Sequence, residues 1–333
     1  MADLPSVQIT HNGETLIVNE GESVLDCLLR HGHIVPYSCK TGACQSCLIK
    51  AIDGTPGEQA MLGLKSTLKK QNFFLACQCL PKENLTVCEP LLEESSFECK
   101  VVDKVKLNHD VIALRVELCA DFPCRSGQFV NIVHPDGKTI RSYSIANLPD
   151  KDQYIEFNIR RIAGGKMTNW LHDVVNKGDS LRIRGASGDC FYCHHEEEER
   201  HFSIVLAGTG TGLAPLIGIL LDALNQEHKG KIILLHGVRS ESDLYYREML
   251  EKLTVDFGCF DYIPCVLASG NSEEAFLPSR HIADSMLDAI KDLEPSKILA
   301  YFCGNPEMVA LLKESFLQAL GLSISFPILF SYC

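Results

Sequence analysis

The 333-residue sequence has no surplus of basic residues: 31 lysines and arginines stand against 43 aspartates and glutamates, for a net charge of −12. Proteins that bind nucleic acid usually have the opposite balance, so we expect no nucleic-acid partner. The N-terminus, MADLPSVQITHNGE, also lacks the basic stretch and apolar core of a secretory signal peptide. We therefore expect a cytoplasmic protein, and we do not interpret its 16 cysteines as a disulfide scaffold.

Residues 202–221 carry no charge and are long enough to cross a membrane. However, Gly208, Gly210, Gly212 and Pro215 fall together near the middle of this segment. Glycine and proline interrupt regular structure, so we predict a buried strand over residues 203–207, a glycine turn and a buried helix. We expect no membrane span.

The length predicts two or three domains, at about 100–200 residues per domain. We place the boundaries in two polar stretches, EESSFE at residues 93–98 and EEEER at residues 196–200, and expect the second to be a solvated loop. The predicted domains are residues 1–92, 98–198 and 201–333. The surplus of negative charge lies mostly at the end, since residues 202–333 contain 16 acidic and 9 basic residues.

The three segments differ in their hydrophobic patterns. The first opens with alternating apolar residues around Asn12-Gly13, a strong hairpin signal, followed by a predicted helix over residues 22–30 and a long loop over residues 32–47. The middle segment is rich in predicted strands, at residues 99–108, 111–118, 129–134, 154–162 and 180–185. In the last segment strands alternate with helical patterns, which predicts a parallel α/β sheet. These strands are expected at residues 203–207, 231–238, 261–267 and 298–304.

Four cysteines have the spacing of an iron–sulfur site. Cys39, Cys44 and Cys47 form C-x4-C-x2-C in YSCKTGACQSC, and Cys77 follows in LACQC. This spacing is typical of the thiolate ligands of a plant-type [2Fe–2S] cluster. Such a cluster is anionic and needs backbone N–H donors around its sulfurs, and the small residues of the loop allow the backbone to approach closely.

Zinc is the alternative metal for this loop, but zinc ribbons usually have two C-x2-C pairs and this loop has one. Cys79 lies two residues after Cys77 and is the alternative fourth ligand, although we interpret it as a packing residue. Cys190 and Cys193 form a C-x-x-C pair without a second pair. We assign them and the remaining cysteines to packing.

The middle segment contains two motifs that suit a phosphate-bearing cofactor. Arg141 opens RSYS at the start of a predicted strand, and its guanidinium can bind a phosphate through two hydrogen bonds. Gly164 and Gly165 precede a predicted helix, whose first N–H groups can also bind phosphate. Each motif is weak alone, because a residue such as Tyr143 is commonly a half-buried strand residue; the two together are more informative.

The last segment contains G-x-G-x-G, formed by Gly208, Gly210 and Gly212, between a predicted strand and a helix that begins near Pro215. It is not the G-x-G-x-x-G dinucleotide fingerprint, but its strand–turn–helix context suits a pyrophosphate at a helix N-terminus. Cys303, taken alone, would be a buried thiol at the end of a strand.

Together these motifs resemble those of the iron–sulfur flavoprotein reductases of the ferredoxin–NADP reductase superfamily that have an N-terminal plant-type ferredoxin domain. This group includes the reductase components of methane, phenol and benzoate oxygenases and the CDP-6-deoxy-glucoseen reductases. The resemblance covers essentially the whole chain. It implies a β-grasp [2Fe–2S] ferredoxin domain, an antiparallel β-barrel FAD domain and an α/β parallel-sheet NAD(P) domain.

The resemblance also implies roles for the flavin motifs. The family's R-x-Y-S motif matches Arg141, Tyr143 and Ser144, which would bind the flavin pyrophosphate, stack on the isoalloxazine and hydrogen-bond near N5. Its G-G-x-x-S/T motif matches Gly164, Gly165 and Thr168, again at the pyrophosphate. The cofactor implied is FAD rather than FMN, because the FMN-using relatives have their ferredoxin domain at the C-terminus.

In the family the glycine-rich nucleotide loop ends in proline, as it does here with Pro215. The family's C-G-x-x-x-M motif matches Cys303, Gly304 and Met308, which places Cys303 beside the nicotinamide. Ser144 and Cys303 are therefore the candidate catalytic residues that the resemblance implies.

The choice between NADH and NADPH depends on the residues after the strand at 231–238. A 2′-phosphate needs cationic partners, and only Arg239 is at hand, with Glu241 and Asp243 close by. We therefore predict NADH, with NADPH as the alternative. Phe330 and Tyr332 are candidates for the family's C-terminal aromatic over the flavin, but the family's acidic residue before it is missing.

We predict that the protein passes a hydride from NAD(P)H to FAD, then single electrons to the [2Fe–2S] cluster and on to an oxygenase or monooxygenase component. The alternatives are a CDP-6-deoxy-glucoseen reductase acting with a deoxysugar dehydratase, and a non-enzymatic ferredoxin-like electron carrier. The intact glycine motifs argue against the carrier. We expect a protein that is monomeric when free and an acceptor with a basic docking face, so that turnover falls as ionic strength rises.

Overall fold

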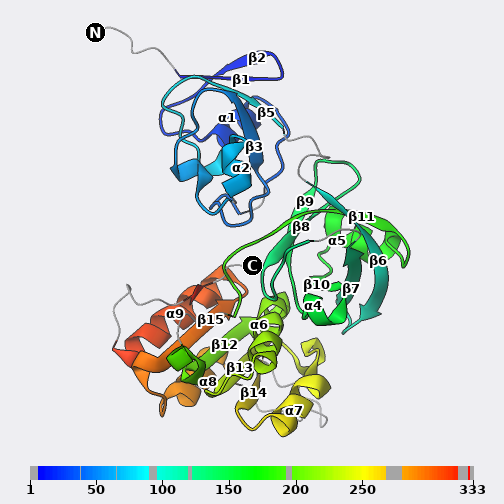
Figure 1. The fold of residues 1–333 in the computed structure, drawn as a ribbon, viewed down its shortest axis with the longest axis vertical. Helices are drawn as coiled ribbons and strands as arrows, with labels where there is room; N and C mark the ends of the chain where they lie inside the picture. The colour runs from blue at the N-terminus through cyan, green and yellow to red at the C-terminus, as the bar shows by residue number, and fades with distance from the viewer. Residues whose placement is uncertain are drawn as a thin grey trace. The chain divides into compact units, whose positions relative to one another are not determined.

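The computed structural model describes residues 7–37, 39–64, 66–89, 96–118, 122–192, 197–267, 280–321 and 329–330. Its chain divides into two compact units. The first consists of residues 1–99, 130–142 and 181–188, and the second of residues 100–129, 143–180 and 189–333. The structure contains three sheets (Figure 1), one in each predicted segment, while the exact domain boundaries stay predictions.

The first sheet is mixed, and its N-terminal hairpin is as predicted. Strands β1 and β2 pair antiparallel around Asn12 and Gly13, whose φ angles of 53° and 82° are those of a tight hairpin turn. Strand β1 also pairs in parallel with β5. The sheet order is β2 (Glu14–Ile17), β1 (Gln8–His11), β5 (Leu85–Cys88), β3 (Leu48–Asp53) and β4 (Phe73–Leu75). The short helical elements are α1 (Val24–Arg30), η1 (Gln59–Met61), α2 (Ser66–Lys70) and η2 (Ala76–Gln78).

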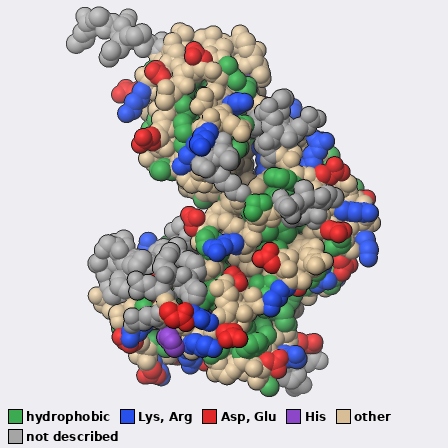
Figure 2. Space-filling model, in the orientation of Figure 1, with side chains coloured by type: hydrophobic (Ala, Val, Ile, Leu, Met, Phe, Trp, Pro, Cys, Tyr) green, Lys and Arg blue, Asp and Glu red, His purple; other side chains and the backbone are tan. Residues whose placement is uncertain are grey.

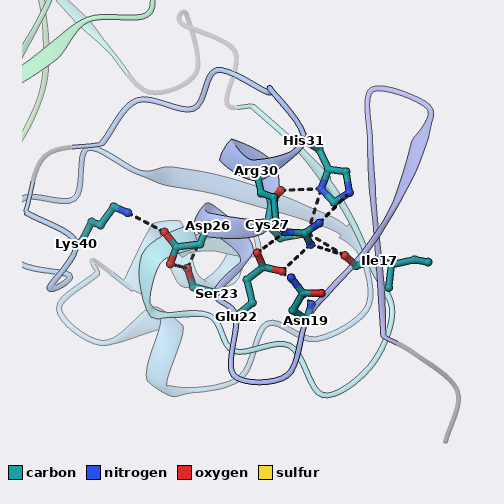
Figure 3. Close-up of polar contacts among 9 residues, drawn as sticks. All are labelled: Ile17, Asn19, Glu22, Ser23, Asp26, Cys27, Arg30, His31 and Lys40. Carbon is teal, nitrogen blue, oxygen red and sulfur yellow. Dashed lines mark hydrogen bonds and ion pairs between the residues drawn. The ribbon is translucent and has the colours of Figure 1, made fainter. Parts of the chain in front are cut away.

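Helix α1 begins two residues later than predicted because the residues before it form a cap. The Oγ atom of Ser23 accepts a hydrogen bond from the Asp26 N–H at 3.1 Å, as an N-cap does. Glu22 lies outside the helix, where it accepts the Asn19 N–H at 2.9 Å and pairs with the Arg30 guanidinium at 2.7 Å (Figure 3).

The second sheet consists of six strands, and all of the strands predicted for the middle segment form. The RSYS motif was predicted to open a strand. It instead fills β9 to its end, since only Ile140 precedes it in that strand. Strands β7 and β10 pair antiparallel from Ile155 opposite Val116 to Arg160 opposite Val111. The order is β10 (Ile155–Arg160), β7 (Val111–Leu118), β6 (Phe97–Lys106), β11 (Ser180–Ser187), β8 (Phe129–Val133) and β9 (Ile140–Ser144). The helical segments are α4 (Pro149–Asp152), α5 (Lys166–Asn169) and a π-helical turn, η3 (Trp170–Val174).

The third sheet is parallel, with helices on both faces. Its order is β14 (Phe260–Val266), β13 (Ile232–Val238), β12 (Ser203–Thr209), β15 (Ile298–Cys303) and β16 (Leu329–Phe330). Alternate residues of the strands pack on α6 (Leu213–Asn225) and α7 (Arg247–Asp256), and the others on α8 (Ile282–Ile290) and α9 (Pro306–Leu320). Strands buried on both faces explain the continuous apolar runs in this part of the sequence.

The uncharged segment at residues 202–221 is the predicted strand, turn and helix: β12, the turn η5 (Gly210–Gly212) and most of α6. In the part of the chain that the structure describes, no helix is both long enough and apolar enough to cross a bilayer. The expectation of a solvated loop at the acidic run is corrected in part. Residues Glu197–His201 form a 3-10 turn, η4, in which Arg200 donates to the carbonyl of Gln226 at 2.7 Å, next to the end of α6.

Candidate cofactor and nucleotide sites

The first candidate site is the cysteine loop before β3. The N–H of Cys44 donates to the sulfur of Cys39 at 3.3 Å, the N–H of Cys39 donates to the sulfur of Cys44 at 3.5 Å, and the Thr41 N–H donates to Cys39 at 3.3 Å. The hydrogen bond from the Cys44 thiol lowers the pKa of Cys39 to about 4. Cys39 and Cys44 are therefore one pair, surrounded by the N–H donors that anionic sulfur requires.

Cys47 and Cys77 form a second pair. A hydrogen bond from the Cys47 thiol lowers the pKa of Cys77 to about 6, and Cys77 also accepts from the Gly42 N–H. The side-chain amide of Gln78 donates to the Cys77 sulfur at 3.5 Å. Two thiols in each of two pairs match a [2Fe–2S] cluster, in which each of two irons binds two cysteines.

A single zinc ion fits this loop less well, because a tetrahedral zinc ion binds its four ligands around one point, whereas these four cysteines form two pairs. Cys79, the alternative ligand, is fully buried and its thiol donates to the Pro56 carbonyl at 3.2 Å. Burial raises the pKa of Cys79 to about 12, which suits the packing role that we predicted.

The conformation of the cysteine loop is held by contacts that the cysteine spacing does not reveal. Lys40 has a φ of 57°, in the left-handed region, and its ammonium pairs with Asp26 of α1 at 2.7 Å (Figure 3). Gly42 has a φ of 85°, and a Cβ there would lie 2.9 Å from Cγ of Gln78. The Gln78 amide also donates to the Lys40 carbonyl at 3.2 Å. Helix α1 and Gln78 thus hold the loop in a conformation that most residues avoid.

Within the first compact unit the same loop contacts β8, and sequence reasoning missed this contact. The side-chain amide of Asn131 donates to the Cys44 carbonyl at 3.0 Å, and its oxygen accepts from the Ser142 hydroxyl at 2.7 Å. Asn131 is buried, and Ser142 lies between Arg141 and Tyr143 in sequence. Nothing in the local pattern of FVNIV marks Asn131, because its role depends on residues far away in the chain.

The predicted flavin residues lie in both compact units. Arg141, in the first unit, is exposed, and its guanidinium donates to the carbonyl of its neighbour Ile140 at 2.8 Å. Tyr143 and Ser144, in the second unit, end β9; the Tyr143 ring lies 6.4 Å from that of Phe157, and Ser144 is buried. The structure therefore presents these three side chains on one strand.

The glycine pair of the flavin segment forms a turn that Thr168 closes. Gly164 has a φ of 69°, and Gly165 is the N-cap of α5, as predicted. The hydroxyl of Thr168 accepts the Ile162 N–H at 3.1 Å, and it lies so close to Gly165 that a Cβ on that residue would be only 2.7 Å from it. The spacing G-G-x-x-T is thus explained by packing between the threonine and the second glycine.

The nucleotide motifs meet at the carboxyl edge of the parallel sheet, where open α/β sheets bind ligands. Gly208 lies opposite Cys303 in the β12–β15 pairing. A Cβ on Gly212 would lie 2.4 Å from the Cys303 carbonyl oxygen, and a Cβ on Gly304 would lie 2.9 Å from the Met308 side chain. The two motifs, about ninety residues apart in sequence, therefore pack backbone against backbone.

The structure also describes Pro215, Cys303 and Arg239, which were predicted for this site. Pro215 lies in the first turn of α6, which begins at Leu213. The Cys303 side chain is fully buried, so its contact with nicotinamide stays a prediction. Arg239 is exposed after β13. Tyr332 and Cys193 lie outside the described residues, and so does the side chain of Phe330.

The acidic residues near Arg239 have partners that the sequence did not indicate. Glu241 pairs with Arg247 at 2.8 Å, and Arg247 also pairs with Glu251 at 2.7 Å. Asp243 accepts the Ser240 N–H at 2.9 Å and forms a capping box with it. Arg247 is a second cation after β13, but it is shared between two carboxylates.

Comparison with known proteins assigns each segment. Residues 7–82 match a 2Fe-2S iron-sulfur cluster binding domain, residues 98–192 an oxidoreductase FAD-binding domain and residues 206–314 an oxidoreductase NAD-binding domain. The fold is similar to that of the cytochrome P450 reductase GcoB of Amycolatopsis, with a TM-score of 0.66 and 24% identity over 98% of both chains.

Two curated relatives align with nearly the whole chain. The ferredoxin–NAD(P)+ reductase component of the naphthalene 1,2-dioxygenase system of Pseudomonas putida is 32% identical over 91% of this chain and 92% of its own length. The phenol hydroxylase P5 protein of Acinetobacter pittii is 28% identical over 91% of this chain and 87% of its own length. The chain therefore belongs to the family of iron–sulfur flavoprotein reductases, which use NAD(P)H, FAD and a [2Fe–2S] cluster to transfer electrons.

Proposed function

We propose that this protein is the reductase component of a multicomponent oxygenase system, and that it oxidises NADH to supply an oxygenase component with electrons. The observation that carries the proposal is the order of cluster, flavin and nicotinamide domains in a chain that aligns over 91% of its length with reductase components of phenol and naphthalene oxygenase systems. Bound FAD would accept a hydride from the nicotinamide and release electrons singly to the cluster. The protein's own task is to bind these groups at fixed positions and exclude water.

We assign the cluster ligands to Cys39, Cys44, Cys47 and Cys77. Their arrangement in two pairs and the N–H donors to Cys39 and Cys77 support this assignment. Donors to sulfur stabilise negative charge on the cluster and so tune its reduction potential.

We assign flavin binding to Arg141, Tyr143 and Ser144 on β9 and to the turn that Thr168 closes. An exposed guanidinium and a glycine turn that leads into a helix are suited to a pyrophosphate. The Tyr143 ring, supported by Phe157, is suited to stacking against a flat ring system.

The preference for NADH over NADPH rests on charge after β13. The carboxylates of Glu241 and Asp243 would repel a 2′-phosphate, while Arg247 is already held by Glu241 and Glu251. Arg239 remains as an exposed cation, and one cation beside two carboxylates is a poor phosphate site.

The decisive experiment is an anaerobic titration of the holoprotein with NADH and then NADPH, followed by visible absorbance. We expect NADH to bleach both the flavin and the iron–sulfur bands, and kcat/KM with cytochrome c as acceptor to favour NADH. A preference for NADPH would overturn the nucleotide assignment. If neither nucleotide bleached the flavin, the protein would be an electron carrier.

A second experiment tests the docking face for the oxygenase. Turnover with a cognate oxygenase that falls as salt is added would support a charged docking face. Acidic and basic side chains are interspersed on the face that Figure 2 shows.

A further inference from the structure

Two adjacent tyrosines follow β13 and have no role in the assignments above. Tyr245 is buried, and its hydroxyl donates to the carbonyl of Gly210 at 3.0 Å. Gly210 is the middle glycine of the nucleotide loop and has a φ of 55°. A buried side chain therefore fixes the orientation of one peptide group in the loop that is to bind the pyrophosphate.

Tyr246 points to a different element, strand β10 of the six-stranded sheet. Its hydroxyl donates to a carboxylate oxygen of Glu156 and accepts from the Asn158 amide at 3.0 Å. Glu156 and Asn158 are both buried, and Arg115 donates to the second oxygen of Glu156 at 2.7 Å. All of these residues belong to the second compact unit.

The backbone between the two side chains is held in an unfavourable conformation. Tyr246 has a φ of 59° and is the N-cap of α7, a left-handed position that bulky residues rarely adopt. Asn108 supports the same segment by donating to the Asp243 carbonyl at 2.8 Å. Strain of this kind persists only where the surroundings determine the conformation, and it is enriched at functional positions.

The surface behind Tyr245 is also rigid. The ring of His236 packs edge-on against Tyr245, with centroids 5.4 Å apart, and lies opposite Gly208 in the β12–β13 pairing. His236 is fully buried. Buried neighbours therefore support the Tyr245 ring in the position from which its hydroxyl reaches Gly210.

We propose that Tyr245 and Tyr246 are positioning residues for hydride transfer, which together fix the nucleotide loop at Gly210 relative to strand β10 of the flavin-binding sheet. This inference rests on the proposed oxidation of a nicotinamide by bound FAD. Hydride transfer needs the reacting atoms about 3–3.5 Å apart, so a small shift of the loop slows the step. The two hydroxyls act on different elements, but the short backbone segment between them makes them one unit.

The test compares Tyr245→Phe, Tyr246→Phe and the double variant, with Tyr192→Phe as control. Tyr192 is a fully buried tyrosine that hydrogen-bonds His228 at 3.0 Å, so its replacement removes the same kind of hydroxyl from a bond whose partner lies neither in the nucleotide loop nor on β10. Each holoprotein is checked for FAD content and for its oxidised visible spectrum. Stopped-flow reduction under anaerobic conditions then separates the Kd for NADH from the limiting rate of flavin reduction.

We expect Tyr245→Phe to raise the Kd for NADH about 3–10-fold, the effect of one neutral hydrogen bond. Tyr246→Phe should lower the limiting reduction rate about tenfold and increase the isotope effect with deuterated NADH, with FAD content unchanged. In the double variant, the ratio of the limiting reduction rate to the Kd for NADH should fall by less than the product of the two single decreases in this ratio, because the pair acts as a unit. Wild-type values in both single variants would overturn the proposal, and so would equal losses in the Tyr192→Phe control.

A second readout does not depend on turnover. Amide hydrogen exchange of the oxidised holoprotein, without nucleotide, should become faster at residues 208–213 in Tyr245→Phe and stay unchanged in the control. Unchanged exchange would refute the role of Tyr245 in holding the loop. If wild-type protein is reduced by neither NADH nor NADPH, the proposed function fails, and the exchange measurement still decides whether Tyr245 orders the loop.

Discussion

The contact between Gly212 and Cys303 predicts a large effect from adding one methyl group. In Gly212→Ala the new Cβ would lie 2.4 Å from the Cys303 carbonyl oxygen, 2.6 Å from its carbon and 2.7 Å from the Gly304 nitrogen. These atoms are backbone at the end of β15, where Cys303 is paired with Gly208, so no side-chain rotation relieves the clash. Forcing extra volume into a packed site typically costs about 1–3 kcal/mol.

The assay for Gly212→Ala is thermal unfolding of the holoprotein together with the Kd for NADH. A domain of about 150–250 residues loses about 2–4 °C of melting temperature for each kcal/mol of lost stability. The Kd for NADH should also rise, because the loop must move away from β15. The matched control is Gly258→Ala, where a Cβ meets nothing within 4 Å and φ is not left-handed. A melting temperature and a Kd for Gly212→Ala equal to those of Gly258→Ala would refute the reasoning.

Three further predictions concern the cluster, the flavin turn and the sheet. Cys77→Ser should abolish the iron–sulfur absorbance while Cys79→Ser retains it, since Cys79 is bonded to Pro56; the reverse pattern would exchange the two roles. Thr168→Ala removes the acceptor of the Ile162 N–H and should weaken FAD binding about fivefold by fluorescence titration, and unchanged binding would separate this turn from the flavin site. Burial lowers the pKa of His236 to about 3, below its unfolded value, so the unfolded state takes up a proton as pH falls below about 6.5 and the protein loses stability. Between pH 7 and pH 5 the free energy of unfolding, measured with urea, should therefore fall about 2 kcal/mol less in His236→Gln than in the wild type, and an equal fall would contradict the assignment.

Much of the fold is predictable because it is encoded locally. The Asn12-Gly13 turn and the alternation around it specify the first hairpin, and the apolar strands of the last segment are continuous because both faces of that sheet are covered. The cysteine spacing and the glycine motifs likewise lie within short segments. These are the features that a period, a turn residue or a ligand spacing can reveal.

The remaining parts of the site depend on contacts between distant residues. Asn131 reaches the cluster loop from β8, and Arg247 reaches Glu241 from the start of α7. Tyr245 and Tyr246 lie in an ordinary polar-aromatic stretch, and only the tertiary structure separates their partners. The start of α1 also differs from the prediction. Ser23 caps the helix, so that the helix begins at Val24 and not at residue 22.

The nucleotide loop lies directly against main-chain atoms at the end of β15, the carbonyl group of Cys303 and the nitrogen of Gly304. The distance between the loop and this strand is therefore limited by backbone on both sides. For protein engineering this makes Gly212 a fixed position, because any side chain there would push the loop and the strand apart.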